Sequence, residues 1–166
     1  MKVEIRRAIP ADADFLVQLY AHEEVEPFLA ASRPKDREAV LAELDRNPQE
    51  AGIFVIEVDG ERAGTMSFEV ANRRSRIASL GGVAVHPDFR GRRIADEAAG
   101  RFQRHLIHEL GYHRLQLEVY AFNERAIAHA ERAGFVREGV RRRAYRRHGE
   151  WVDGVLFGLL AEEVKN

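Results

Sequence analysis

The sequence predicts one mixed α/β (α+β) domain, in which a central mixed sheet carries helices on its faces. Three observations support this class. The chain has 166 residues, without repeat, linker or low-complexity tract, so we expect residues 1–166 to form a single domain. Apolar residues alternate with period two in some segments and recur at helical spacing in others. The resulting order is strand, helix, helix, three strands, helix, strand, helix and two strands.

The N-terminal segments predict a strand followed by two helices. Residues 3–9 alternate apolar and polar side chains, and Pro10 ends this strand. Asp12 and Asp14 lie where the first turn of a helix favours acidic residues. The apolar stripe of that helix is formed by Phe15, Leu16, Leu19 and Tyr20. Asp36 is predicted to cap a second, short helix.

A meander of three strands follows. Residues 53–58 and 62–70 are joined by Asp59-Gly60, a dipeptide typical of a two-residue hairpin turn. Residues 77–85 form the third strand, which contains the pair Gly81-Gly82. Paired glycines in a strand indicate either a bulge or a place where another backbone or a ligand comes close, and the sequence leaves both readings open.

The second half of the chain predicts two helices and three strands. A helix begins at Arg92 and carries an apolar face. That face is formed by Ile94, Ala98, Phe102, Leu106 and Leu110. Residues 115–119 alternate as a strand, and Asn123 is predicted to cap the next helix. Strands around residues 135–140 and 155–160 end the chain.

Composition excludes several function classes. The chain has no cysteine, which excludes disulfides, thiolate metal sites and a cysteine nucleophile. The formal net charge of -1 argues against a dedicated nucleic-acid binder. The N-terminus lacks an apolar core of signal-peptide length, and no apolar run approaches the roughly 20 residues of a membrane helix. We therefore expect a cytoplasmic protein with no metal site and with no nucleic-acid or membrane partner.

Positive charge gathers where the predicted strand 77–85 gives way to a helix, in the run V-H-P-D-F-R-G-R-R-I-A. The first N–H groups of a helix have no partner within it, and the helix dipole makes that end positive. A diphosphate would satisfy both features. Gly91 lets the backbone approach an anion, and Arg90, Arg92 and Arg93 add charge. The spacing alone fits a diphosphate-binding turn and a solvated, arginine-rich helix start equally well.

Two motifs in order resemble those of a known family. Residues 83–95, V-A-V-H-P-D-F-R-G-R-R-I-A, resemble the coenzyme-A-binding motif of the GNAT superfamily, the acyl-CoA-dependent N-acetyltransferases. Residues 123–135, N-E-R-A-I-A-H-A-E-R-A-G-F, resemble the second motif of that family, and the resemblance spans essentially the whole chain. It implies a central, mixed, mostly antiparallel sheet flanked by four helices. It also implies acetyl-CoA as co-substrate, with no metal.

The resemblance implies a set of coenzyme contacts. The pantetheine arm would lie against the strand end like an added strand, bound by backbone groups of Val83 and Val85, and a backbone N–H would serve the oxyanion. Asn123 would contact the coenzyme arm besides capping its helix. The diphosphate would lie on the turn formed by Arg90, Gly91, Arg92, Arg93, Ile94 and Ala95.

Two positions depart from the motifs of the family. Arg93 replaces the first glycine of the coenzyme motif, so its side chain must turn outward or bind a phosphate itself. Ala130 replaces the tyrosine that the family commonly uses to protonate the leaving thiolate, and an alanine has no proton to donate. Tyr120, His129 and Tyr145 remain as candidate donors, and water is a further one.

Amine acetylation needs a base, because an ammonium group must lose a proton before it can attack a thioester. Glu118 is the first candidate, since L-E-V-Y-A-F-N resembles a stretch of N-terminal-amine acetyltransferases whose glutamate is thought to draw off the proton through water. A strand glutamate that faces solvent or pairs with an arginine is the alternative reading. Glu69, on the neighbouring part of the sheet, is the second candidate.

The resemblance implies transfer of acetyl from acetyl-CoA to a primary amine by direct attack in a ternary complex. The acceptor would be a small amine, a polyamine, an amino acid or a protein N-terminus, and a homodimer would be ordinary for this fold. The acidic residues Glu23, Glu24 and Glu26 fall where the family binds its acceptor, which would suit a cationic amine. Exposed helix ends are often acidic without such a role.

Two other functions stay open. An acyl-CoA-binding sensor or regulator with the same fold and little catalysis would explain Ala130. An RNA- or ribosome-associated module would explain the arginine-rich run over residues 137–147. The net charge of -1 favours a solvated hairpin there, and an acidic partner or the 3′-phosphate of the coenzyme are further ligands for it.

Overall fold

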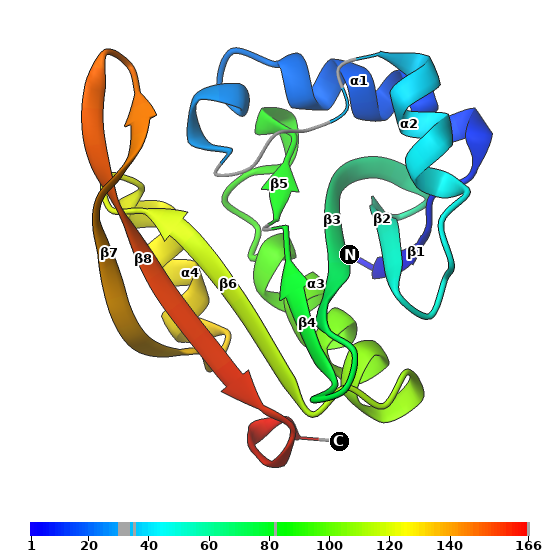
Figure 1. The fold of residues 1–166 in the computed structure, drawn as a ribbon. Coiled ribbons are helices and arrows are strands. Elements are labelled where there is room, and N and C mark those ends of the chain that lie inside the picture. Colours follow the sequence, from blue (N-terminus) through cyan, green and yellow to red (C-terminus); the bar gives the residue numbers. More distant parts are fainter. Residues whose placement is uncertain (30–33, 35, 82, 166) are drawn as a thin grey trace.

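The computed structural model describes residues 1–29, 34, 36–81 and 83–165. Its strands form one sheet in the order β1-β2-β3-β4-β6-β8-β7, with β5 paired to β3 beside this path (Figure 1). The strand pairs are antiparallel except β4 with β6. The described strands are β1 (Val3–Arg7), β2 (Ala51–Val58), β3 (Glu61–Asn72), β4 (Ile77–Leu80), β5 (Ala84–Val85), β6 (Arg114–Tyr120), β7 (Val136–Arg147) and β8 (Glu150–Leu160), and the α-helices are α1 (Ala13–Ala21), α2 (Arg37–Leu44), α3 (Ile94–Arg104) and α4 (Glu124–Arg132). The predicted mixed class, with a mostly antiparallel sheet and four helices, is confirmed.

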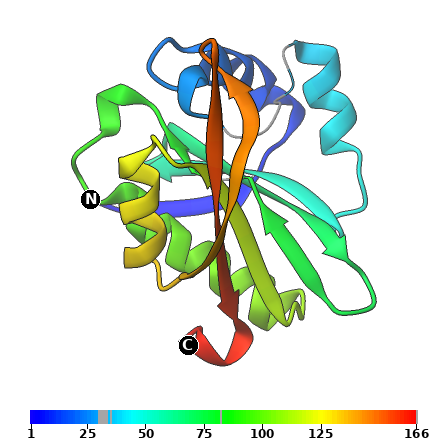
Figure 2. The ribbon, with the colours of Figure 1, turned by 60° about the vertical axis from the view of Figure 1, so that its left-hand side comes forward.

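The helices cover both faces of the sheet (Figures 1 and 2). On one face, Leu16 of α1 and Val40 of α2 form a buried cluster with Ile53 of β2. On the other, the main core joins α4 and Phe102 of α3 to Phe54, the next residue of β2. Because neighbouring residues of a strand point to opposite faces, β2 packs against the α1–α2 pair on one face and against α3 on the other, and it is buried along most of its length.

Three predicted boundaries were wrong. Residues 77–85 form two strands, because β4 pairs with both β3 and β6 whereas β5 pairs with β3 alone. Gly82 of the predicted glycine pair lies outside the described residues. Helix α3 begins at Ile94 instead of Arg92, because Arg93 has a left-handed φ of +56°. The last hairpin is longer than predicted, and its largely exposed strand β7 carries the arginine run as the solvated hairpin reading requires.

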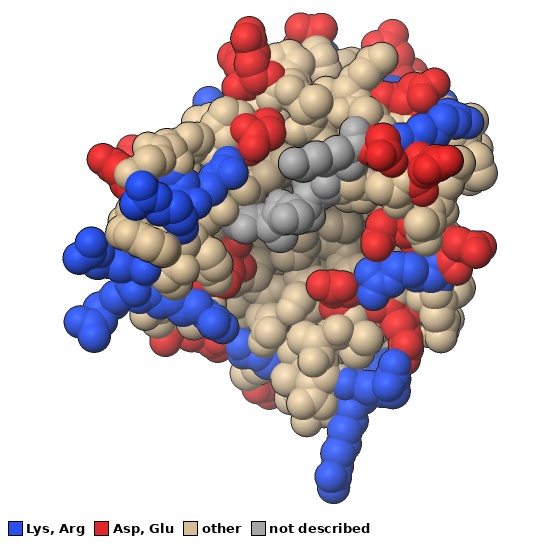
Figure 3. Space-filling model, turned by 45° about the horizontal axis from the view of Figure 1, so that its top comes forward, with Lys and Arg blue, Asp and Glu red and all other residues tan. Residues whose placement is uncertain are grey.

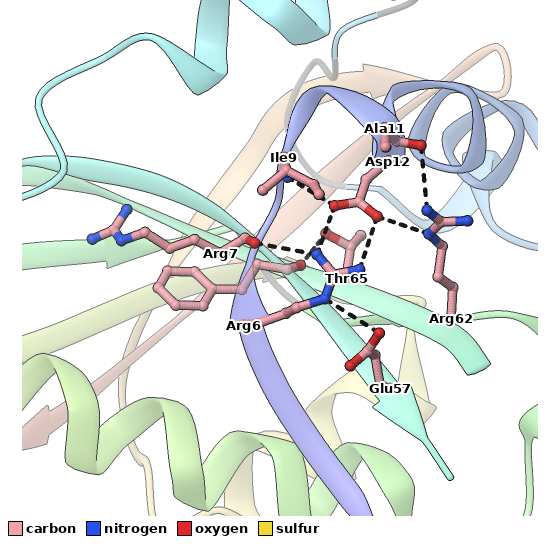
Figure 4. Close-up of polar contacts among 9 residues, drawn as sticks. Arg6, Arg7, Ile9, Ala11, Asp12, Glu57, Arg62 and Thr65 are labelled. Atoms are coloured by element: carbon pink, nitrogen blue, oxygen red, sulfur yellow. Dashed lines mark hydrogen bonds and ion pairs between the residues drawn. The ribbon is translucent and has the colours of Figure 1, made fainter. Parts of the chain in front are cut away.

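Asp12 lies at the start of α1, as predicted, and it is also buried and forms ion pairs. Its carboxylate accepts hydrogen bonds from Arg6 at 2.7 Å, from Arg62 at 2.7 Å and from the Ile9 N–H at 2.8 Å (Figure 4). Burial alone would raise the pKa of Asp12, but the three donors outweigh it and hold the pKa well below its ordinary value. The cluster therefore fixes β1 and β3 to the start of α1.

The predicted caps and the first hairpin turn are confirmed. Asp36 accepts a hydrogen bond from the Ala39 N–H at 2.8 Å, and Asn123 accepts one from the Ala126 N–H at 3.1 Å. Asp59-Gly60 joins β2 to β3. No helix in the described part of the chain is long and apolar enough to cross a membrane.

Candidate functional site

The sheet opens between β5 and β6. β4 pairs with β6 through residues 77–79, while β5 continues along β3 and has no strand on its other edge in the described sheet (Figure 1). The His86 N–H donates to Ala63 O at 2.7 Å, and alternate residues of a strand direct their N–H groups to opposite edges. The N–H of Val85 therefore points to the open edge, as the predicted pantetheine contact requires.

Gly64 of β3 permits this arrangement. A Cβ atom at this position would collide with the carbonyl oxygen of Ala84, so glycine lets β5 approach β3 closely. Gly81-Gly82 indicated either a bulge or a close approach in this region, whereas Gly64 was not predicted. The signal of Gly64 is a single glycine inside a predicted strand.

A cavity of about 790 Å³ passes through the opening. Residues 83–85 line it on one side and residues 117–119 on the other. Its α3–α4 end lies between those two helices, and its acidic end is bordered by Glu23, Glu24 and Phe28. Figure 3 shows the surface hollowed near the middle of the view, with Lys and Arg side chains gathered to the left, where the β7–β8 hairpin lies.

Two residues with positive φ shape the turn before α3. Gly91 has a φ of +84°, a conformation that side-chain-bearing residues rarely adopt. Arg93 has a φ of +56°, which explains why glycine is usual at this position of the motif. The Arg93 side chain is 84% exposed, so it turns outward. The first N–H groups of α3 follow this turn and have no acceptor within the helix.

At the α3–α4 end of the cavity, arginines outnumber carboxylates among the lining residues. Arg90 borders the acidic end, because its Nη1 lies 3.9 Å from Glu24 Oε1. Arg90 donates a hydrogen bond to the Glu24 carbonyl at 2.8 Å, which fixes its side chain. Burial, and after it the charge of Arg125, lower the pKa of Arg90. Arg125 also lines the cavity, and the sequence analysis missed it. Its signal is a cation in the first turn of a helix, where the dipole disfavours one unless an anion binds nearby.

The predicted coenzyme contacts come together at this cavity, with one exception. The lining includes Val83, Val85, Arg90, Gly91, Arg93, Ile94, Ala95 and Asn123. Arg92 is not among the described lining residues, because its guanidinium lies over the Phe89 ring, 5.7 Å from the centroid. Arg92 therefore does not share the placement that the motif implied for it.

Helix α4 meets α3 at the same end. Nδ1 of His129 lies 2.9 Å from Oδ1 of Asp96, and Arg132 Nε lies 3.1 Å from Oδ2 of that carboxylate. All three side chains line the cavity. Ala130 lines it as well and is only 2% exposed, so the position of the family's tyrosine faces the cavity without a proton donor.

Glu118 lines the middle of the cavity from β6. The Tyr145 hydroxyl donates to its Oε1 at 2.6 Å, and Arg141 Nε lies 3.5 Å from its Oε2. The sequence left open whether Glu118 is a general base or pairs with an arginine. In the structure it pairs with Arg141 and also borders the cavity.

Glu69 does not reach this site. Its side chain is 60% exposed, and its Oε2 lies 3.3 Å from Arg46 Nη1. It is not among the described residues that line the cavity, because residue 69 of β3 pairs with Ala51 and Ser79, away from the opening. The second candidate base is therefore placed elsewhere on the surface.

The acidic end combines carboxylates with two exposed aromatic rings. Glu23 and Glu24 line the cavity, whereas Glu26 is turned to Arg147, 3.6 Å from its Nη2. Phe28 and Phe122 also line it, with ring centroids 6.2 Å apart, and the sequence analysis missed both. Within the described residues, no group of three or more His, Asp or Glu side chains is arranged to hold a metal ion.

Comparison with known sequences agrees with this geometry. The model of the acetyltransferase (GNAT) family matches residues 14–135. Among curated proteins, the SPbeta prophage-derived uncharacterized N-acetyltransferase YokL of Bacillus subtilis (strain 168) is 29% identical over 127 residues, which cover 76% of this chain and 70% of that protein.

Solved structures share the fold over nearly the whole chain. A spermidine N-acetyltransferase from Vibrio cholerae in complex with CoA and spermine superposes with a TM-score of 0.89 at 18% identity, over 99% of this chain and 98% of that one. The ribosomal L7/L12 alpha-N-protein acetyltransferase RimL in complex with coenzyme A gives a TM-score of 0.85 at 21% identity, over 96% and 94% of the two chains.

Proposed function

This chain belongs to the acetyltransferase (GNAT) family, and we propose that it transfers the acetyl group of acetyl-CoA to a primary amine while both substrates are bound. One observation carries this proposal. A single cavity passes through a gap in the sheet, from the start of α3, where arginines outnumber carboxylates in the lining, to an end lined by Glu23 and Glu24. Such a cavity suits an anionic coenzyme at one end and a cationic acceptor at the other.

The α3–α4 end supports the coenzyme part of the proposal. The diphosphate lies on the turn of Arg90 to Ala95, where Gly91 and the first N–H groups of α3 approach it. Arg90 and Arg125 neutralise its charge. The thioester arm lies in the gap, bound by backbone groups of Val83 and Val85, and Asn123 borders the arm from α4. One solved relative holds CoA with spermine, and another holds coenzyme A.

The acidic end supports an amine as acceptor. Glu23 and Glu24 attract a cation, and the rings of Phe28 and Phe122 offer apolar contact for the chain that carries it. We propose that the acceptor is a small amine, a polyamine, an amino acid or a protein N-terminus. The two solved relatives are named for spermidine and for a ribosomal protein N-terminus.

Glu118 is the proposed general base. The acceptor ammonium gives one proton to Glu118 through water, and the proton then passes to solvent. The amine nitrogen bonds to the thioester carbon, and the N–H of Val85 stabilises the oxyanion. As the C–S bond breaks, the nitrogen loses its second proton and the sulfur gains one. The products are an N-acetyl amine, the coenzyme thiol and one proton in solution.

The proton for the sulfur has no tyrosine source at position 130. His129 is the remaining candidate donor that lines the cavity, since Tyr145 is engaged by Glu118 and Tyr120 is buried outside the lining. Water is the alternative carrier. This missing donor is also the observation that favours the second candidate function, an acyl-CoA-binding sensor with little catalysis.

Release of free thiol from acetyl-CoA tests the proposal. The protein is incubated with acetyl-CoA and a panel of amines that covers polyamines, amino acids and peptides with free N-termini. Amine-dependent thiol release would support the enzyme, and binding of acetyl-CoA with no turnover of any amine would favour the sensor. Absence of coenzyme binding in calorimetry would overturn both.

A cytoplasmic location and a homodimer stay predictions of the sequence.

A further inference from the structure

Glu118 and Tyr145 meet although their strands are not neighbours. Glu118 lies on β6 and Tyr145 on β7, and β8 runs between them. The Tyr145 hydroxyl nevertheless donates to Glu118 Oε1 at 2.6 Å. The two side chains therefore cross over β8 on one face of the sheet.

A bulge in β7 brings Tyr145 to this place. Arg141 pairs with Gly154 of β8, whereas Tyr145 pairs with Val152, so four steps along β7 match two steps along β8. Arg143, inside the bulge, has a left-handed φ of +50°, and its N–H donates to Asp153 Oδ1 at 2.7 Å. Bulges of this kind redirect side chains and are frequent beside functional sites.

Gly154 leaves the space in which the two side chains cross. A Cβ atom there would overlap Glu118 Oε2 and would come within 2.8 Å of Tyr145 Cε2. The φ of Gly154 is not in the left-handed region, so its backbone conformation does not demand glycine. The requirement is space for the carboxylate and the ring.

The two oxygens of the Glu118 carboxylate have different surroundings. Oε1 holds the tyrosine hydroxyl. Oε2 is buried and accepts no hydrogen bond from the described residues, and the charged group nearest to it on β7 is Arg141, at 3.5 Å. The Tyr145 ring packs edge-on against Tyr120, with centroids 5.8 Å apart. The hydrogen bond to Glu118 and burial raise the pKa of Tyr145, so its hydroxyl stays a donor at neutral pH.

We propose that Tyr145 is the positioning residue of the Glu118 base, and that the β7 bulge and Gly154 of this chain seat it. The inference rests on the proposed function. The hydroxyl holds Oε1 and fixes the orientation of the carboxylate at the cavity, where it takes the proton of the acceptor ammonium through water. Tyr145 itself donates no proton to the substrate in this arrangement.

The test is Tyr145→Phe, assayed as kcat/KM against pH with an acceptor that the wild-type protein acetylates. Loss of the hydroxyl removes a donor from the carboxylate, so the rising limb of the profile should move to higher pH. We expect kcat to fall about 10-fold and the Kd of coenzyme A to stay unchanged. The acceptor amine titrates in the same way in both assays, so a difference between the two pH profiles arises from the protein.

Two further variants make the result specific. Gly154→Ala keeps both functional groups but displaces them, so it should lower kcat in the same way and leave the Kd of coenzyme A unchanged. Tyr112→Phe is the matched control, because it also removes a hydroxyl hydrogen bond of 2.7 Å, to Gln49 O, outside the described cavity lining. Its pH profile should match that of the wild-type protein.

The outcomes separate this inference from the proposed function. Turnover by the wild-type protein with an unchanged pH profile and kcat in Tyr145→Phe would overturn the role of Tyr145 and leave the acetyltransferase reaction intact. A wild-type protein that binds coenzyme A but acetylates no amine would overturn the proposed function, and the role of Tyr145 with it. A profile that moves equally in Tyr112→Phe would make the effect one of general stability and contradict the inference.

Discussion

Nδ1 of His129 lies 2.9 Å from Oδ1 of Asp96, and this contact joins α4 to the first turn of α3. Burial alone would raise the pKa of Asp96, but hydrogen bonds from Arg132 and His129 lower it below its ordinary value. The carboxylate is therefore ionised at neutral pH. It holds together the two helices that border the α3–α4 end of the cavity.

A double-mutant cycle should detect this link. We expect Asp96→Ala and His129→Ala to be coupled by about 1.5–3 kcal/mol in the free energy of unfolding measured in urea, because hydrogen bonds to charged groups contribute about that much. The matched control is Glu97 with Arg101, an exposed pair on α3 at 3.4 Å, with an expected coupling of about 0.5 kcal/mol or less. Additive effects at Asp96 and His129 would show that the contact does not hold the helices.

Gly91→Ala should weaken coenzyme binding. An alanine at a φ of +84° is strained by about 1–2 kcal/mol, which would shift the turn and raise the Kd for coenzyme A about 5- to 30-fold. Gly60 has the nearly equal φ of +85° in the β2–β3 turn. At both glycines, an added Cβ atom would have no other atom within 4 Å, so neither substitution causes a clash. Gly60→Ala therefore carries the same strain outside the cavity lining. Calorimetry that gives one Kd for both variants would exclude this turn as the binding site.

Arg93→Gly should leave the affinity for coenzyme A unchanged within about threefold. The Arg93 side chain is 84% exposed and turned outward, and glycine accepts its positive φ without strain. Arg90→Ala is the comparison: both arginines border the cavity, but the Arg90 side chain is only 29% exposed. We expect Arg90→Ala to raise Kd about 10-fold, as the loss of one charge-assisted contact does. A similar loss in Arg93→Gly would mean that Arg93 binds a phosphate.

Asp12→Asn should lower the free energy of unfolding and should make it depend less on pH in the acid range. The folded pKa of Asp12 is depressed, so its stabilisation is complete above the ordinary aspartate pKa of about 4 and is lost as pH falls through the folded pKa. We expect a loss of about 2–4 kcal/mol at neutral pH, because two arginines lose their buried partner. Urea unfolding from pH 3 to pH 7 measures both effects. A variant that keeps the wild-type slope below pH 5 would contradict this role.

Local signals in the sequence predicted much of the fold. The caps at Asp36 and Asn123 depend on one side chain and a nearby N–H group, so residue type was sufficient there. The break at residues 77–85 was only partly predicted, because its cause is pairing: β5 follows β3 while β6 diverges. Gly64 was missed for the same reason, since its role depends on the Ala84 carbonyl on another strand.

The candidate site divides in the same way. The motif around Gly91 identified a continuous stretch of backbone, and most of it lines the cavity. The L-E-V-Y-A-F-N stretch ranked Glu118 above Glu69, but only the sheet register shows that Glu118 lies at the opening and Glu69 on an exposed surface. Arg125 and Phe28 join the site from segments that lie far apart in the chain.

By itself, the sequence determined the family, the class of fold and the turn that faces the coenzyme, because these depend on short segments whose residues interact with their own backbone. The tertiary structure decided which carboxylate meets the cavity and what holds it. The hydrogen bond from Tyr145 to Glu118 requires a bulge in β7, a glycine in β8 and the opening beside β6. Because these features lie on three separate strands, they produce no periodic pattern along the sequence.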